Sequence, residues 1–486
     1  MSPALNLRPI LFVLGWLLSV LGAAMLIPVA VDLADGNSDW TGFLAAAVIT
    51  GFVGVSLVLT TRGVPLVLRR QQAFLLTTLA WVASAFFSAL PFMLSDYRLD
   101  LADAVFETVS GLTTTGSTVM TGLDTAPPGL LLWRSLLQWL GGMGIIGMSM
   151  VIFPFLRISG MQLFKTESSD TSSEKILPSV GRLGIAIGLV YLGLSALCML
   201  AYWTAGMSGF DAILHAMTTL STGGYSSHDS SFGYFEEPAI HWIAVIFMAA
   251  GALPFALYIG AIMGKPLMLF RDRQVRAFLL FLLLVCLSVA LWLTATRDLP
   301  FGTALTLASF NVTSVITTTG FASDDYSLWG GYVVVLMFLL MIVGGCTGST
   351  TGGIKMFRLD IAVKLFGSYV RGLILPHSVN VPFYRGTPIT DDLARAVLLY
   401  IFMFAASCMA LSIALTLFGL DALTAATAGI QAIGNIGPGL GPVVGPAGNF
   451  AAIPDGAKWL LAFGMLLGRL EFFTVLVLFS RRFWTA

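Results

Sequence analysis

Four short segments of this otherwise apolar chain combine hydroxyl side chains with glycine. They read VSGLTTTGST, TLSTGGYS, ITTTGFAS and AIGNIGPG, at residues 109–118, 219–226, 316–323 and 432–439. Backbone carbonyls and threonine hydroxyls can replace the water shell of a cation. Glycine permits the positive φ that turns a carbonyl out of its usual direction. The chemistry that these residue types favour is therefore cation coordination.

The four segments align on one glycine each, and a short apolar run precedes every one. The aligned glycines are Gly116, Gly223, Gly320 and Gly437, and the runs cover 104–112, 211–220, 304–316 and 422–433. Such runs are too short to cross a bilayer, which takes about 20 residues. Longer apolar segments stand before and after each run. The unit helix, half-helix, extended segment, helix therefore recurs four times at intervals of roughly 100 residues, which indicates a repeat architecture.

The starts of the half-helices share a second feature. Asp103, Asp211 and Asp421 stand at or near the expected helix start, where a carboxylate caps free N–H groups. The third copy has Pro300 and Thr303 there instead. Four such units around one axis would point four negative helix ends at a shared cavity, a setting in which irregular backbone is tolerated at membrane depth. This arrangement would favour cations over anions. The alternative is that the four segments are re-entrant loops with a packing role and no role in ion binding.

The composition indicates a membrane protein. Of 486 residues, 57% are hydrophobic and 10% are charged, whereas soluble domains carry about 25% charged residues. The first long apolar segment exceeds the core of a signal peptide, so we expect it to be retained. The expected fold is an all-α polytopic membrane protein with four tandem repeats around one pseudo-fourfold pore. Spanning candidates are 10–30, 43–59, 183–205, 277–294 and 332–343.

The expected organisation is two extra N-terminal helices followed by four pore repeats. We place the extra helices in 1–70 and the repeats in 71–182, 183–274, 275–390 and 391–486. The four cysteines lack CxxC spacing and stand in or beside apolar segments, which is typical of packing residues rather than of a metal site. The net charge is zero and no basic stripe is present, so nucleic acid is not an expected partner. No bound cofactor is expected.

Charged residues sort into alternating connections. Because basic loops stay in the cytoplasm, we expect a bacterial inner-membrane protein with both termini inside. The acids then face outward, where negative charge concentrates cations at the mouth of a pore. The acidic set is Asp32, Asp35, Asp39, Asp124, Asp229, Glu236, Glu237, Asp324, Asp325 and Asp455. The basic set is Arg62, Arg69, Arg70, Arg157, Lys165, Lys175, Arg182, Lys265, Arg271, Arg273, Arg276, Lys355, Arg358, Lys364, Arg371, Arg385, Arg395, Arg481 and Arg482.

With these motifs in view, the chain resembles the TrkH family of the Trk/Ktr/HKT superfamily of K+ transporters. The resemblance covers essentially the whole chain and rests on TTTGST, STGGYS, TTTGFA and GNIGPG. In this superfamily a serine at the first filter glycine goes with Na+ permeation, so Gly116 resembles the K+-selective members. The fourth segment departs from the threonine-rich pattern. The ion-coordinating residues that the resemblance implies are Thr114, Thr115, Gly116, Ser221, Thr222, Gly223, Thr318, Thr319, Gly320, Asn435, Ile436 and Gly437.

A glycine-rich stretch, GGCTGSTTGG at 344–353, interrupts the helix after the third segment. Each of its glycines weakens a helix by about 1 kcal/mol relative to alanine. A cytoplasmic turn is one interpretation, because Lys355 follows closely. The resemblance implies instead an intramembrane loop that closes the path below the filter. The candidate gate residues are Gly344, Gly345, Thr347, Gly348, Ser349, Thr350, Thr351, Gly352, Gly353 and Arg469.

Ionisable residues within the membrane segments are functional candidates by default. The resemblance implies that Arg469, midway along the last span, projects into the pore beneath the filter. A contact with another helix or with the loop carbonyls is the alternative. Glu471 is two residues further on and therefore a poor direct partner. We expect Glu107 and His215, on the half-helices, to brace the filter by hydrogen bonds; Arg134 and Gln138 also lie in or near membrane segments.

The expected function is K+ uptake through a channel-like pore with an intramembrane gate. An H+- or Na+-coupled K+ symporter of the same architecture is the alternative. An enzyme is not expected, because HDSS at 228–231 lacks the partners of a catalytic site. The resemblance implies Rb+ as a substitute ion, membrane lipid, a homodimer and a TrkA-like cytosolic ring that binds nucleotides or NAD. The basic stretch from Lys355 to Arg395 is the candidate dock, with ordinary positive-inside loops as the alternative.

Overall fold

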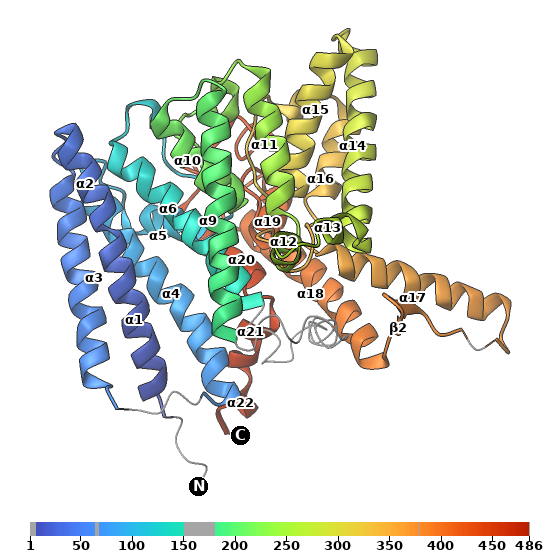
Figure 1. Cartoon of the computed structure of the whole chain (residues 1–486), viewed down its shortest axis with the longest axis horizontal. Helices are drawn as coiled ribbons and strands as arrows, with labels where there is room; N and C mark the ends of the chain where they lie inside the picture. The colour runs from blue at the N-terminus through green and yellow to red at the C-terminus, as the bar shows by residue number, and fades with distance from the viewer. Residues whose placement is uncertain (1–5, 64–67, 150–179, 379, 486) are drawn as a thin grey trace.

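The described chain contains several apolar helices of membrane-spanning length. The computed structural model describes residues 6–63, 68–149, 180–378 and 380–485. In these ranges six helices are long and apolar enough to cross a membrane, or up to eight if each of two sharply bent helix pairs is one span. Most of the long helices run broadly along one direction, whereas α12 is seen end-on and α17 projects sideways from the bundle (Figure 1). The chain is therefore a polytopic helical membrane protein.

The first two spanning segments pack together at one side of the molecule (Figure 1). The first consists of α1 (Arg8–Ala24) and its continuation α2 (Leu26–Asp35), and the second is α3 (Trp40–Thr60), which runs back beside them. Their contact is made by small residues, since a Cβ on Gly22 would lie 2.9 Å from the backbone nitrogen of Gly51. Asp32, which is fully buried, accepts a hydrogen bond from the backbone N–H of Gly129 at 2.7 Å. The pair is thereby fixed to the start of α6.

The rest of the chain repeats one order of elements: a long helix, a short helix, an extended segment and a further helix. The first unit contains α4 (Arg70–Leu94), α5 (Leu101–Leu112) and α6 (Pro128–Gly147). The second contains α9 (Val180–Thr204), α10 (Gly209–Leu220), α11 (Pro238–Gly251), α12 (Phe255–Ile262) and α13 (Leu267–Arg271). The third contains α14 (Arg273–Arg297), α15 (Phe301–Ile316), α16 (Gly331–Leu340) and α17 (Met356–Ile374). The fourth contains α18 (Asp391–Thr416), α19 (Ala422–Gly434), α20 (Asp455–Arg469), α21 (Phe473–Leu476) and α22 (Arg481–Thr485).

Short 3-10 turns and one small hairpin complete the secondary structure. The turns are η1 (Leu123–Thr125), η3 (Ser231–Tyr234), η4 (Tyr326–Leu328) and η5 (Val477–Phe479). The strands β1 (Phe383–Tyr384) and β2 (Thr387–Pro388) pair antiparallel across Arg385 and Gly386, which both have positive φ, as a two-residue hairpin turn requires. Apart from this short hairpin, the described chain is helical with connecting turns and loops, as the sequence predicts.

Three of the four short helices begin two or three residues earlier than the sequence predicts, and in two of these the cap is a different residue. Asp100 accepts from the Asp103 N–H at the start of α5, and Ser208 accepts from the Asp211 N–H at the start of α10. Asp103 and Asp211 therefore lie in the first turn instead of at the cap. Asp421 caps α19 directly, as expected, and Pro300 precedes α15 without a side-chain cap.

Packing between units arranges the short helices in a ring. The last long helix of one unit contacts the short helix of the next: α6 packs on α10, and α11 packs on α15. Helix α20, the second long helix of the fourth unit, packs on α5 and so connects the fourth unit to the first. From residue 104 to 112, α5 is buried throughout. The short helices are therefore interior elements surrounded by the longer ones.

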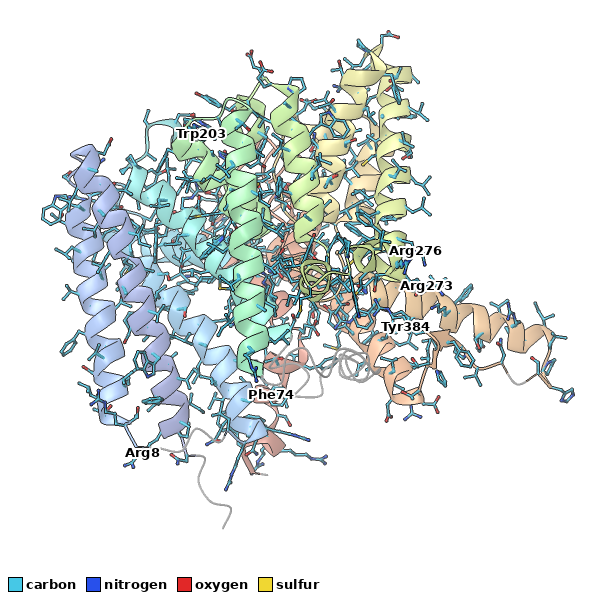
Figure 2. All side chains as sticks on the ribbon, viewed as in Figure 1. Arg8, Phe74, Trp203, Arg273, Arg276 and Tyr384 are labelled. Carbon is cyan, nitrogen blue, oxygen red and sulfur yellow. The ribbon has the colours of Figure 1, made fainter. Side chains whose placement is uncertain are left out.

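The two ends of the described chain lie at the same end of the molecule. Figure 2 places Arg8 at this end and Trp203 towards the opposite one, and α22 lies beside the start of α4 at the same end in Figure 1. This agrees with termini on one side of a membrane, although the side itself stays a prediction. Arg157, Lys165 and Lys175, which belong to one predicted cytoplasmic connection, lie outside the described residues.

Candidate ion site and glycine-rich loop

The short helices α5, α10, α15 and α19 end in the same backbone turn. The residues with left-handed φ are Thr114, Thr222, Thr318 and Asn435, at 52°, 53°, 56° and 55°. The next residue of each segment donates its N–H to the carbonyl five residues earlier, over 2.8–2.9 Å. Such turns satisfy the free carbonyls of a helix end. The four segments thus share one geometry at the negative ends of four helix dipoles.

This geometry corrects the alignment of the second segment by one residue. Gly116, Gly224 and Gly320 have φ of 90°, 83° and 87°, so Gly224 rather than Gly223 is the structural equivalent of Gly116. Ser221 is accordingly the C-terminal cap residue of α10, as Thr113 is of α5. Sequence alone could not separate two adjacent glycines, because either one can adopt a positive φ. We define the glycine segments as 113–116, 221–224, 317–320 and 434–437.

The glycine segments meet one another in cyclic order. A Cβ on Gly116 would collide with the carbonyl oxygen of Gly223, and one on Gly224 would collide with the carbonyl oxygen of Thr319. A Cβ on Gly320 would lie 2.7 Å from the nitrogen of Gly437, and one on Gly437 would lie 3.2 Å from the oxygen of Gly116. Segments about 100 residues apart therefore converge on a common centre line, where a side chain would not fit.

Two side-chain oxygens of the glycine segments have no hydrogen-bond donor. Within the described residues, Thr114 Oγ1 and Asn435 Oδ1 are buried and have no hydrogen-bond partner. A hollow lined by Gly116, Gly224, Gly320 and Gly437 opens where the four segments meet. Buried oxygens at negative helix ends are suited to a cation that has shed its water.

Polar side chains behind the glycine segments hold their backbone in place. Gln138 donates to the carbonyl of Gly223 at 2.7 Å and accepts from the N–H of Tyr225 at 3.0 Å. Ser117 Oγ donates to Gln431 Oε1 at 2.9 Å. Sequence reasoning missed Gln431; its one signal is an amide within an otherwise apolar short helix.

Glu107 and Arg134 form a buried ion pair with an N–O distance of 2.8 Å. Glu107 also accepts from the N–H of Val119, and Arg134 donates to the carbonyl of Ser226, so the pair joins the first two units. His215 Nε2 lies 3.0 Å from Ser226 Oγ. The expected bracing role of Glu107 and His215 is confirmed by these contacts.

An imidazole joins loops of the same two units. His228 Nδ1 lies 2.6 Å from Asp124 Oδ1, and its ring stacks on Tyr234 with centroids 3.5 Å apart. Burial favours the neutral ring, but hydrogen bonds to Asp211 and Asp124 outweigh it and raise the pKa of His228 above its ordinary value. The hollow lined by Gly116, Gly224, Gly320 and Gly437 is therefore bordered by a partly charged cluster that includes His228.

The glycine-rich loop, 344–353, lies directly beneath the glycine segments. Thr350 Oγ1 is 3.1 Å from Thr222 Oγ1, and the N–H of Gly352 donates to Thr318 Oγ1 at 2.8 Å. The N–H of Gly353 donates to the carbonyl of Gly434 at 2.9 Å. The loop thus bonds to three of the four glycine segments, and all of it except half-buried Gly352 is buried. The interpretation as a cytoplasmic turn is therefore wrong.

Interrupted helices hold the loop from its other side. The bend between α11 and α12 is 97°, and there the N–H of Cys346 donates to the Ala252 carbonyl while the N–H of Phe255 donates to the Gly348 carbonyl. At the break between α20 and α21, Arg469 Nη1 donates to the Thr350 carbonyl at 2.8 Å. The contact of Arg469 with loop carbonyls, which the sequence left as an alternative, is therefore present.

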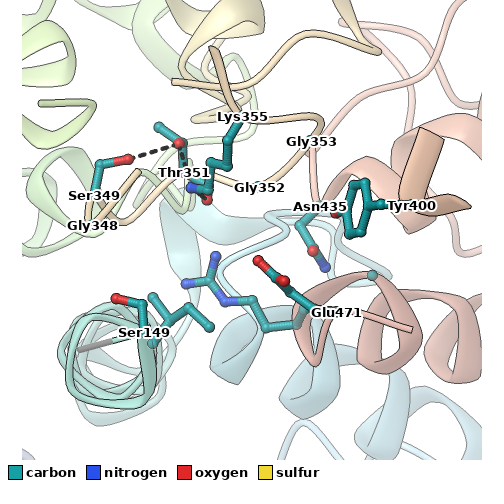
Figure 3. A pocket seen from close by; sticks show the side chains of 13 residues that line it. Ser149, Gly348, Ser349, Thr351, Gly352, Gly353, Lys355, Tyr400, Asn435 and Glu471 are labelled. Carbon is teal, nitrogen blue, oxygen red and sulfur yellow. Dashed lines mark hydrogen bonds between the residues drawn. The ribbon is translucent and has the colours of Figure 1, made fainter. Parts of the chain in front are cut away.

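Charged residues gather below the loop around an inner cavity. Figure 3 shows Lys355, Asn435 and Glu471 facing this hollow. Glu471 pairs with Arg358 over 2.7 Å, which confirms that it is not the partner of Arg469. Lys355 and Arg358 are 8% and 0% exposed. Their placement among surface cytoplasmic charges is therefore wrong, because charge counting along a chain does not distinguish a loop surface from a cavity wall.

Comparison with known proteins gives full-length matches. The family model TrkH, described as cation transport protein, matches residues 41–485. The chain is 47% identical to the Trk system potassium uptake protein TrkI of Halomonas elongata, over 98% of this chain and 96% of that protein. It is 34% identical to the Trk system potassium uptake protein TrkH of Escherichia coli, over 99% and 100%. The crystal structure of the potassium transporter TrkH from Vibrio parahaemolyticus superposes with a TM-score of 0.92 at 33% identity, covering 99% of this chain and 100% of that one.

Proposed function

This chain belongs to the TrkH family of cation transport proteins, and from that premise we propose that it takes up potassium ions along the line where its four glycine segments meet. It is a transport protein and not an enzyme. Relatives at 34–47% identity are named as potassium uptake proteins, which supports K+ as the substrate. Rb+ is the expected substitute ion.

The observation that carries the proposal is the cyclic contact of four glycine backbones at four negative helix ends. A dehydrated cation on this line would meet backbone carbonyls of the glycine segments, with the unpartnered hydroxyl of Thr114 in the first of them. Gly116 keeps the first backbone close to the second, because any side chain there collides with Gly223. We infer that this close packing sets the ring size that favours K+ over Na+.

The glycine-rich loop acts as the gate in this proposal. Its hydrogen bonds to Thr222 Oγ1, Thr318 Oγ1 and the Gly434 carbonyl put backbone and side chains across the exit from the glycine segments. Arg469 supports the loop from below and places a positive charge on the path. Conduction then requires these bonds to break, so the described structure corresponds to a closed state.

We further propose the assembly that the family resemblance implies. Repeats at 71–182, 183–274, 275–390 and 391–486 surround one pore per chain, and two chains form a homodimer in the bacterial inner membrane with both termini in the cytoplasm. A cytosolic nucleotide- or NAD-binding ring docks on the basic inner surface. Since Lys355 and Arg358 are buried, that surface relies on exposed residues such as Arg371 and Arg395.

Growth of potassium-uptake-deficient bacteria at low external K+ tests the substrate. We expect the chain to restore growth on K+, and Rb+ uptake in place of K+, without comparable Na+ uptake. Flux in proteoliposomes then separates a pore from the symport alternative, because a pore shows no fixed ratio of K+ to H+ or Na+. Failure to restore growth by a correctly inserted protein would contradict the proposal.

A further inference from the structure

The inner cavity below the glycine-rich loop carries more positive than negative charge. Its described lining includes the cations Lys355 and Arg469 and one carboxylate, Glu471. Glu471 is already paired with the buried Arg358 at 2.7 Å. Lys355 and Arg469, 8% and 2% exposed, are therefore left without a counter-charge among the described residues. A charge taken out of water without a partner costs several kcal/mol.

Hydrogen-bond donors in the same place are also unsatisfied. Arg469 gives one nitrogen, Nη1, to the Thr350 carbonyl, while its Nε and Nη2 have no partner in the described part of the chain. Lys355 Nζ donates to the carbonyl and the hydroxyl of Thr351. Neutral carbonyls and hydroxyls accept hydrogen bonds from a cation, but they bring no net charge.

Water and helix dipoles do not remove this imbalance. A water molecule would satisfy Arg469 Nε or Nη2 and leave the charge unchanged. The negative ends of the four short helices point at the glycine segments, where a transported cation would use them. A group that supplies both acceptor atoms and negative charge is an anion, and the lining also offers the hydroxyls of Ser149 and Ser349.

We propose that the inner cavity binds a small monovalent anion, such as chloride, between Arg469 and Lys355. Asn435 and Gly352, which line the same cavity, connect the site to the glycine segments and to the loop. Anion occupancy offsets the positive charge of Arg469 just below the gate. The site does not depend on which cation the protein transports.

Thermal unfolding of the purified full-length protein tests the site at constant K+ concentration. We expect chloride or bromide to raise Tm saturably relative to gluconate, a much larger anion. Arg469→Gln and Lys355→Met should each lose this shift. Arg276→Gln, a change at an exposed arginine of α14, should keep it and so controls for general salt effects. An equal shift in all variants, or none in the wild type, would overturn the proposal.

The position of the anion is tested separately by bromide anomalous scattering from crystals of the wild-type protein. A peak within contact distance of Arg469 is expected, and its absence in bromide-grown crystals would reject the site even if the variants fail to fold. Neither readout measures K+ transport. Failure here would therefore leave the proposed uptake function untouched, and failure of uptake would leave this site standing.

Discussion

Replacing Thr350 with valine should open the proposed gate without altering the glycine segments. The Thr350 hydroxyl lies 3.1 Å from Thr222 Oγ1, 3.2 Å from the Leu220 carbonyl and 3.0 Å from the Gly251 carbonyl. With one hydrogen, it donates to one carbonyl and accepts from Thr222. Valine keeps the shape of the side chain and removes both interactions. The substitution therefore raises the free energy of the closed state, in which the loop makes these hydrogen bonds, and leaves the free energy of the open state nearly unchanged.

The size of the effect follows from these two hydrogen bonds. Each contributes about 0.5–1.5 kcal/mol net, so the closed state should lose about 1–3 kcal/mol relative to the open one. Because 1.4 kcal/mol is a factor of ten in an equilibrium constant, the open-to-closed ratio should rise by about 5- to 160-fold. The change in ion flux is the same while the open state is a minor population.

Rubidium flux into proteoliposomes measures this ratio, and the loop offers a matched control. Thr347 lies in the same loop and is also buried, but its hydroxyl has no hydrogen-bond partner among the described residues. Thr347→Val should therefore leave flux near the wild-type value. Flux that is unchanged or lower in a folded, inserted Thr350→Val protein would refute the reasoning, as would an equal rise in Thr347→Val.

Three further outcomes are expected. Gly116→Ser should relax K+ over Na+ selectivity in flux competition, since its Cβ collides with the Gly223 carbonyl and its φ is 90°; unchanged selectivity would count against the site. Deleting residues 345–352 should raise flux by removing the loop, and lost flux in an inserted protein would reject the gate. His228→Gln should lower Tm more at pH 6 than at pH 9. The raised pKa of His228 means that its charged pairing with Asp124 is complete below the ordinary value of 6.5 and is lost as pH rises through the folded pKa; an equal effect at both pH values would contradict this assignment.

Local patterns predicted the elements of the site well. The lengths of the apolar runs distinguished α5, α10 and α19 from spanning helices. The glycine-rich stretch at 344–353 predicted the interruption between α16 and α17. These features depend on residues that are close together in the sequence. The length of an apolar run limits the length of its own helix, and a glycine cluster destabilises the helix in which it stands. The order of the four units followed from the same information.

Long-range contacts were not predictable in the same way. Thr350 and Thr222 are 128 positions apart, and no local pattern indicates that their hydroxyls meet. Lys355 follows the loop as a cytoplasmic lysine would, yet it is buried because α17 begins directly beside the cavity. The alignment of the second glycine segment was wrong by one residue for a related reason: the positive φ of Gly224 goes with its close approach to the Thr319 carbonyl, a contact with a distant segment.

Rubidium anomalous scattering from crystals of the whole protein tests the account most directly. If oxygens of the four segments bind the ion, density will appear on the line between Gly116, Gly224, Gly320 and Gly437, and it will weaken when Na+ replaces Rb+. Density confined to other parts of the molecule, or an empty line at saturating Rb+, would contradict the account.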